Sequence, residues 1–140
     1  MTRSLRHRPT AAIAAIAAIA LTALAACGNE ETLSAQEFVD KVNDEGVKLS
    51  LGEPLITDDT SKELFAVELQ PVASLPGSGR GPVGGSLSAY DDAEGAEDEL
   101  SSCAASADLL CYRAGNIVVV LEGGGIEAQQ LGVAIERLSE

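Results

Sequence analysis

The arrangement of apolar and polar residues along the chain first predicts three amphipathic helices. Ser34 and Glu37 have the spacing of a capping box, and Leu33 lies where it can pack on Phe38 in the first turn of a helix. In the other two segments apolar residues recur three or four positions apart, which is the period of a helix that buries one face. The predicted helices comprise residues 35–45, 91–103 and 127–138.

Alternation of apolar and polar residues predicts half-buried β-strands in the segments between the helices. Val47, Leu49 and Leu51 alternate in this way, before Gly-Glu-Pro at residues 52–54 interrupts the pattern and residues 55–56 resume it. The predicted strands comprise residues 47–51, 63–69, 86–90, 109–114 and 117–122.

The last two strands are separated by Gly115-Asn116, a dipeptide that favours the tight turn of a β-hairpin. A two-residue loop sets the register of the hairpin and places Cys111 opposite Val120. Residues 117–121 are all apolar, so we expect this strand to lie inside the sheet with both faces covered.

Residues 71–85 contain five glycines and three prolines, a composition that predicts a long loop. Two interpretations remain open for this loop. It can be a binding loop, because binding residues concentrate in loops, or an excursion without regular structure. Arg80 lies in its glycine-rich part, where a guanidinium could hold a carboxylate or stay in solvent.

The order of these elements predicts the fold class. Helix, three strands, helix, two strands and helix follow one another without a regular alternation of strand and helix. This order indicates an α+β domain, with a small, mainly antiparallel sheet of about four or five strands and three helices packed on it. We expect the hairpin and the last helix to form the core.

The first 27 residues have the features of an export signal. Basic residues at positions 3–8 precede an apolar run at residues 11–26, which is shorter than the about 20 residues of a membrane span. Leu24-Ala25-Ala26-Cys27 then resembles the lipobox of bacterial lipoproteins. The resemblance implies that the Cys27 thiol receives a diacylglyceryl group and that a peptidase cuts before Cys27. An uncleaved membrane anchor is the alternative.

The resemblance also implies a location and a division of the chain. Residues 1–26 would be a cleaved signal peptide, residues 27–33 the lipidated cysteine with a short tether, and residues 34–140 one acidic domain. Acylated Cys27 would hold the protein in the lipid bilayer, on the outer face of the cell membrane or in the outer membrane of an organism that has one.

The charge of the mature chain limits its partners. It would keep all 22 acidic residues but only six of the nine Lys and Arg residues, which gives a formal charge of −16. Such a surface stays soluble and is repelled by nucleic acid and by anionic headgroups. We therefore expect no nucleic-acid partner.

Two cysteines remain after lipidation of Cys27. Outside the cytoplasm, Cys103 and Cys111 are expected to form a disulfide. A pair of free thiols or a metal site are the alternatives, although the mature chain has no histidine to complete a common zinc site.

Residues 91–99 form the densest cluster of acidic residues. Asp91, Asp92 and Glu94 are candidate ligands for a hard cation such as calcium, although their spacing does not match an EF-hand loop. The alternative is that they stabilise the N-terminus of a helix, where the dipole favours negative charge. No cofactor-binding motif is present, and we expect no cofactor.

The composition argues against catalysis. The one histidine, His7, lies in the expected signal peptide, so schemes that need a Ser-His or Cys-His pair are absent from the mature chain. We expect a non-catalytic accessory lipoprotein that engages an envelope protein. The alternative is a lipoprotein that binds a small ligand or cation through the loop at 71–85 or the acids at 91–99.

Overall fold

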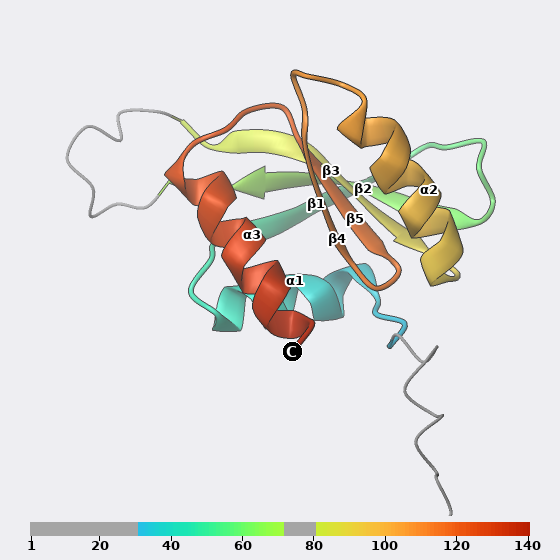
Figure 1. Cartoon of the computed structure of the whole chain (residues 1–140), viewed down its shortest axis with the longest axis horizontal. Helices are drawn as coiled ribbons and strands as arrows, with labels where there is room; N and C mark the ends of the chain where they lie inside the picture. The colour runs from blue at the N-terminus through green and yellow to red at the C-terminus, as the bar shows by residue number, and fades with distance from the viewer. Residues whose placement is uncertain (1–30, 72–80) are drawn as a thin grey trace, which may run out of the picture.

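The computed structural model describes residues 31–71 and 81–140, which form three helices and one five-stranded sheet (Figure 1). The elements, in chain order, are α1 (Ala35–Asp44), β1 (Leu49–Leu55), β2 (Lys62–Leu69), β3 (Val83–Tyr90), α2 (Ala93–Ala104), β4 (Leu110–Ala114), β5 (Ile117–Leu121) and α3 (Ile126–Leu138). The strands lie in the order β1-β2-β3-β5-β4, and all neighbouring pairs are antiparallel. The predicted α+β fold and its element order are therefore confirmed.

Helices cover both faces of the sheet (Figure 1). On one face α1 and α3 contact each other and enclose the main core, whereas α2 packs against β3, β4 and β5 on the other face. The side chains of β5 show this division. Ile117, Val119 and Leu121 belong to the main core. Val118 and Val120 belong to the smaller cluster beside α2, so β5 is covered on both faces as its apolar run predicts.

Helix α1 begins with the capping box that the sequence predicts. The Ser34 hydroxyl accepts the Glu37 backbone N–H at 3.2 Å, and the Glu37 carboxylate accepts the Ser34 backbone N–H at 2.9 Å. Leu33 and Phe38 are both buried in the main core, which fixes the direction in which the chain enters the helix. Gly46 follows the helix with φ +95°, a conformation that side chains with a Cβ rarely adopt.

The β4–β5 hairpin has the predicted register. Cys111 pairs with Val120 across the two strands, and Gly115 in the turn has φ +57°. The hairpin therefore carries Cys111 toward the helix that contains Cys103.

Helix α3 buries the apolar face that its sequence predicts, including Ala128, Leu131 and Ile135. Gly132 within it has a packing reason, because the Tyr112 ring of β4 occupies the space beside it. A Cβ added to Gly132 would lie 2.9 Å from a ring carbon of Tyr112. The glycine thus lowers the intrinsic stability of the helix but lets α3 lie close to the sheet.

The structure corrects the predicted first strand. Residues 52–54 do not interrupt β1, which runs continuously from Leu49 to Leu55 with a shift of register between Leu51 and Pro54. The strand accommodates Pro54 because β1 lies at the edge of the sheet, where one side of the strand needs no hydrogen-bonded partner.

The predicted loop at 71–85 is also too long by its last three residues. Strand β3 begins at Val83, and Gly84 and Gly85 are part of it. A Cβ on Gly85 would collide with the backbone of β5, so this glycine permits close approach of two strands. Gly85 suggests a loop when the sequence is read alone, but the close approach of the neighbouring strand explains why a glycine is present there.

Candidate functional site

The two cysteines of the domain form the expected disulfide. Cys103, near the end of α2, and Cys111, in β4, are joined with their Cα atoms 6.1 Å apart. This separation lies within the usual range for disulfides. The bond connects α2 covalently to the edge strand of the sheet.

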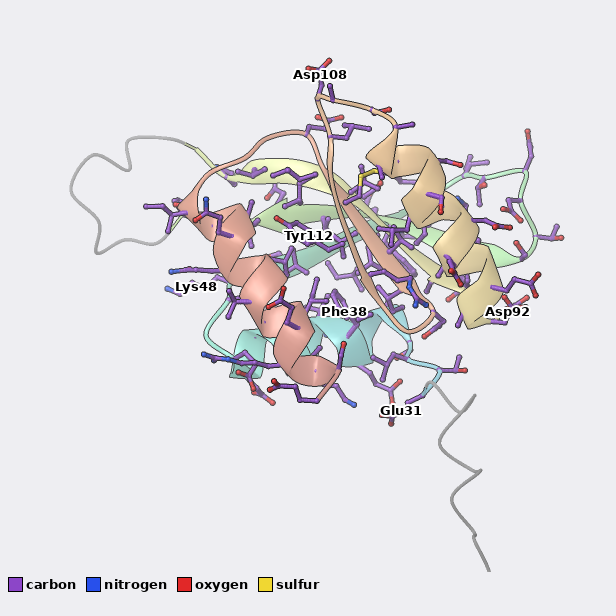
Figure 2. The ribbon with its side chains drawn as sticks, in the orientation of Figure 1. Glu31, Phe38, Lys48, Asp92, Asp108 and Tyr112 are labelled. Carbon is purple, nitrogen blue, oxygen red and sulfur yellow. A yellow bond between two sulfur atoms is a disulfide. The ribbon has the colours of Figure 1, made fainter. Side chains whose placement is uncertain are left out.

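The acidic residues singled out by the sequence lie around the start of α2. Asp91, Asp92 and Glu94 are exposed, and Figure 2 shows Asp92 at the N-terminus of the helix. Asp92 caps α2 by accepting the Gly95 backbone N–H at 2.9 Å, so the helix begins at Ala93, two residues later than predicted. In the two described ranges, no three His, Cys, Asp or Glu side chains are grouped so that they could hold a metal ion.

Several other candidates lie outside the described residues. These are Cys27 with the expected signal peptide, Arg80, and residues 72–80 of the predicted loop.

Glu99 is the member of the 91–99 cluster that the sequence places wrongly. The helical spacing of Ala96, Leu100 and Cys103 predicts that Glu99 lies on the solvent side of the helix. Its side chain is instead only 19% exposed and faces the sheet. The Glu99 carboxylate accepts hydrogen bonds from the hydroxyls of Ser88 and Tyr90 and from the Lys62 ammonium. Lys62 also donates to the Tyr90 oxygen at 3.1 Å.

This cluster of Ser88, Tyr90, Lys62 and Glu99 shifts the acid–base equilibria of its members. Burial and the hydrogen bond to Glu99 raise the pKa of Tyr90. Burial would lower the pKa of Lys62, but its hydrogen bonds to Tyr90 and Glu99 outweigh that effect and raise the pKa. Because each group is engaged by the others, the cluster connects α2 to β2 and β3 and has the properties of a structural network.

A well-formed hollow lies along α3. We call it the α3 groove; it has a volume of about 780 Å³ and runs between the outer side of α3, the turn after α1 and the end of β2. Its lining residues are Glu45, Gly46, Val47, Lys48, Leu69, Gln70, Ile126, Glu127, Gln129, Gln130, Val133, Ala134 and Arg137.

Helix α3 presents a second apolar stripe to this groove. Ile126 is 50% exposed and Val133 is 48% exposed, although both are large aliphatic residues. Positions i, i+4, i+7 and i+11 of the helix are, in order, Ile126, Gln130, Val133 and Arg137. This spacing places all four residues on one side of the helix. The periodicity of the sequence predicts only the buried stripe, but the seven-residue spacing of Ile126 and Val133 is a signal for this second surface.

The charged residues of the groove differ in whether they have partners. Arg137 donates to the Glu45 carboxylate at 3.0 Å across the groove. Glu127 lies in the first turn of α3, where the helix dipole favours an acid. Within the described part of the chain, the exposed Lys48 ammonium has no ion-pair partner, and Figure 2 shows this residue beside α3.

At the opposite end of the sheet, Asn116 binds the beginning of the domain. Its side chain is buried; the amide oxygen accepts the Leu33 N–H at 2.7 Å, and the amide nitrogen donates to the Leu33 carbonyl at 2.9 Å and the Tyr90 carbonyl at 2.8 Å. The strand register places Asn116 next to the Ala89–Ile117 pair, whereas the groove lies at the end that holds Leu69. The chain therefore enters the domain at the end of the sheet opposite Lys48 and Gln70, which line one end of the groove.

The fold is that of a small, disulfide-linked α+β domain with one face of its last helix open to solvent. No protein-family model, curated protein or solved structure matches this chain. Among the described helices, none is both long enough and apolar enough to cross a membrane.

Proposed function

We propose that this protein is a lipid-anchored, non-catalytic binding module of the bacterial envelope, and that it engages another envelope protein through the α3 groove. The observation that carries the proposal is the pair Ile126 and Val133, which stay half-exposed on one side of a helix whose other side is already packed on the core. Exposed apolar residues grouped in a groove with polar borders are typical of interaction surfaces.

Anchoring at Cys27 is supported by the lipobox resemblance and agrees with the disulfide, which is typical of proteins outside the cytoplasm. Cys27 precedes Leu33 by six residues, and Asn116 holds Leu33 at the end of the sheet opposite Lys48 and Gln70. A domain attached in this way would present the Lys48 end of the groove away from the bilayer that holds it.

The shape of the groove favours a protein partner over a small molecule. The exposed stripe from Ile126 to Arg137 spans eleven residues, or about 16 Å along the helix axis. Such a length matches about five residues of an extended chain. A small-ligand site remains the second candidate, because about 780 Å³ falls in the usual range for ligand pockets.

Two observations support a non-catalytic role. The side chains of the polar cluster, Lys62, Tyr90 and Glu99, bond to one another and lie on the opposite face of the sheet from α3. No histidine follows Cys27 to act as a general base.

Site-specific photocrosslinking in intact cells tests the groove. A benzoylphenylalanine at Val133 should give a discrete adduct with one envelope protein. The same residue at Ile56 is the matched control, because Ile56 is a fully exposed aliphatic residue outside the groove lining. Equal adducts from both positions, or none from Val133, would overturn the proposed docking site.

The anchor is tested in the same strain by incorporation of radiolabelled lipid. The wild-type protein should carry the label, and Cys27→Ser should lose it and leave the membrane fraction. Label that persists in Cys27→Ser would contradict the anchoring half of the proposal, whatever the crosslinking shows.

A further inference from the structure

We infer that the α3 groove receives a carboxylate-bearing peptide segment of its partner and that Lys48 selects the carboxylate. This inference rests on the proposed function, since it names the kind of partner that the same groove would take. It is carried by the Lys48 ammonium, which has no ion pair in the described ranges, and by the types of side chain that line the groove.

Of the described basic residues that line the groove, Lys48 is the one that can pair with a ligand at no cost to the fold. The Lys41 ammonium lies 3.2 Å from the Glu31 carboxylate, and Lys62 is held by Glu99. Arg137 is paired with Glu45. Lys48 is exposed, lines the groove, and has no ion pair within the described ranges, so its charge is available to a ligand.

The rest of the lining suits a peptide. Ile126 and Val133 offer apolar contacts about 10 Å apart along the helix, a distance that about three residues of an extended segment span. Gln70, Gln129 and Gln130 each provide an amide that can both donate and accept, as the backbone of a bound segment requires.

The charge of the whole molecule explains why one lysine can decide specificity. The mature chain, with a formal charge of −16, repels carboxylates over most of its surface, so an acidic segment needs a local cation in order to dock. Charges at the border of an interface contribute more to the choice of partner than to affinity, and like charges placed in contact are strongly disfavoured.

Selection from a random library of twelve-residue peptides tests the inference, with the lipidated protein purified in detergent as the bait. Selected peptides should combine apolar residues with Asp or Glu. Their affinity should fall at least about tenfold for Lys48→Glu, because a like charge then meets the ligand carboxylate. Lys41→Glu is the matched control: it makes the same charge change on a residue outside the groove and should alter the affinity less than about threefold.

Two further variants separate the possible failures. Lys48→Gln removes the charge without adding repulsion and should have an intermediate effect. Val133→Asp should abolish binding if the groove is the docking site. Peptides without acids that bind Lys48→Glu normally but not Val133→Asp would overturn this inference and leave the proposed function standing. Peptides that ignore both variants, or no enrichment at all, would overturn both.

Melting temperatures of all variants show whether a loss of binding arises from unfolding. Lys48 is exposed, and the bond from the Gln70 N–H to the Lys48 carbonyl involves only backbone atoms, so the lysine variants should melt with the wild type. A Lys48→Glu protein that melts normally but binds the selected peptides as the wild type does would also refute the role of Lys48.

Discussion

At the scale of single residues, the most consequential side chain of the described structure is a buried asparagine in a turn. Asn116 satisfies the N–H and the carbonyl of Leu33 as a neighbouring strand would, and it also binds the Tyr90 carbonyl. These three bonds use only the side chain of Asn116. Its backbone carbonyl accepts a further hydrogen bond, from the Tyr90 N–H at 2.9 Å. One residue thereby joins the start of the domain, β3 and the hairpin.

Asn116→Ala should lower the free energy of unfolding by about 2–3 kcal/mol, because buried backbone groups of Leu33 and Tyr90 lose their partners. Alanine can adopt the backbone conformation, since no described residue other than glycine has a positive φ. Urea denaturation measures the change. Gln36→Ala, which removes an exposed side chain that bonds only to Asp40, should change it by less than about 0.5 kcal/mol. Equal effects of the two substitutions would contradict the role of Asn116.

The raised pKa values of Tyr90 and Lys62 predict loss of stability in alkali. A group whose pKa is raised on folding stabilises the protein fully below its unfolded pKa, and the contribution is lost as the pH rises through the folded pKa. The free energy of unfolding should therefore fall as the pH increases above about 10. Burial raises the pKa of Tyr112 too, which acts in the same direction.

Ultraviolet titration checks this directly, because the chain has two tyrosines and no tryptophan. Both tyrosines should ionise at higher pH in the native protein than in urea, and Tyr90→Phe should leave one transition. Native tyrosines that titrate as they do in urea would refute the prediction.

At the scale of elements, each helix has a different means of attachment to the sheet. Helix α1 relies on its capping box and on Phe38, and α3 on apolar packing that brings Gly132 against Tyr112. The buried residues of α2 are only Ala96 and Cys103. The polar cluster around Glu99 and the disulfide supplement this small contact.

Replacing Cys103 and Cys111 together by Ala should lower the free energy of unfolding by about 2–3 kcal/mol. The disulfide closes a short loop and so restricts the unfolded chain, and the double variant loses this restriction. The fold should persist, because the main core lies on the other face of the sheet. Circular dichroism in urea measures both effects. A thiol count on the denatured, non-reduced protein should find neither Cys103 nor Cys111 free, and two free thiols would contradict the bridge.

At the scale of the whole molecule, the two ends of the sheet have different features. One end holds the entry of the chain, where Leu33 meets Asn116, and the other holds Lys48 and the start of α3 (Figure 1). The proposed anchor and the Lys48 end of the proposed groove thus lie at opposite ends of the sheet. This separation would keep the binding surface accessible while the domain stays tethered.

The sequence by itself determined the features that depend on neighbouring residues. The α+β class, the capping box at Ser34 and the register of the hairpin follow from periodicity, turn residues and spacing along the chain. Local rules suffice there because the interacting groups are close in sequence or belong to one repeating pattern. The pairing of Cys103 with Cys111 is expected because they are the two cysteines that remain after the implied lipidation of Cys27.

Only the tertiary structure decided the features that depend on contacts between distant segments. Gly85 belongs to a strand because β5 passes close to it, and Glu99 is partly buried because Lys62 and Tyr90 lie opposite. The α3 groove arises where the turn after α1 and the end of β2 meet a helix about 60–80 residues further along. No local pattern specifies which elements become neighbours, because side-chain burial depends on the packing of the whole sheet and its helices.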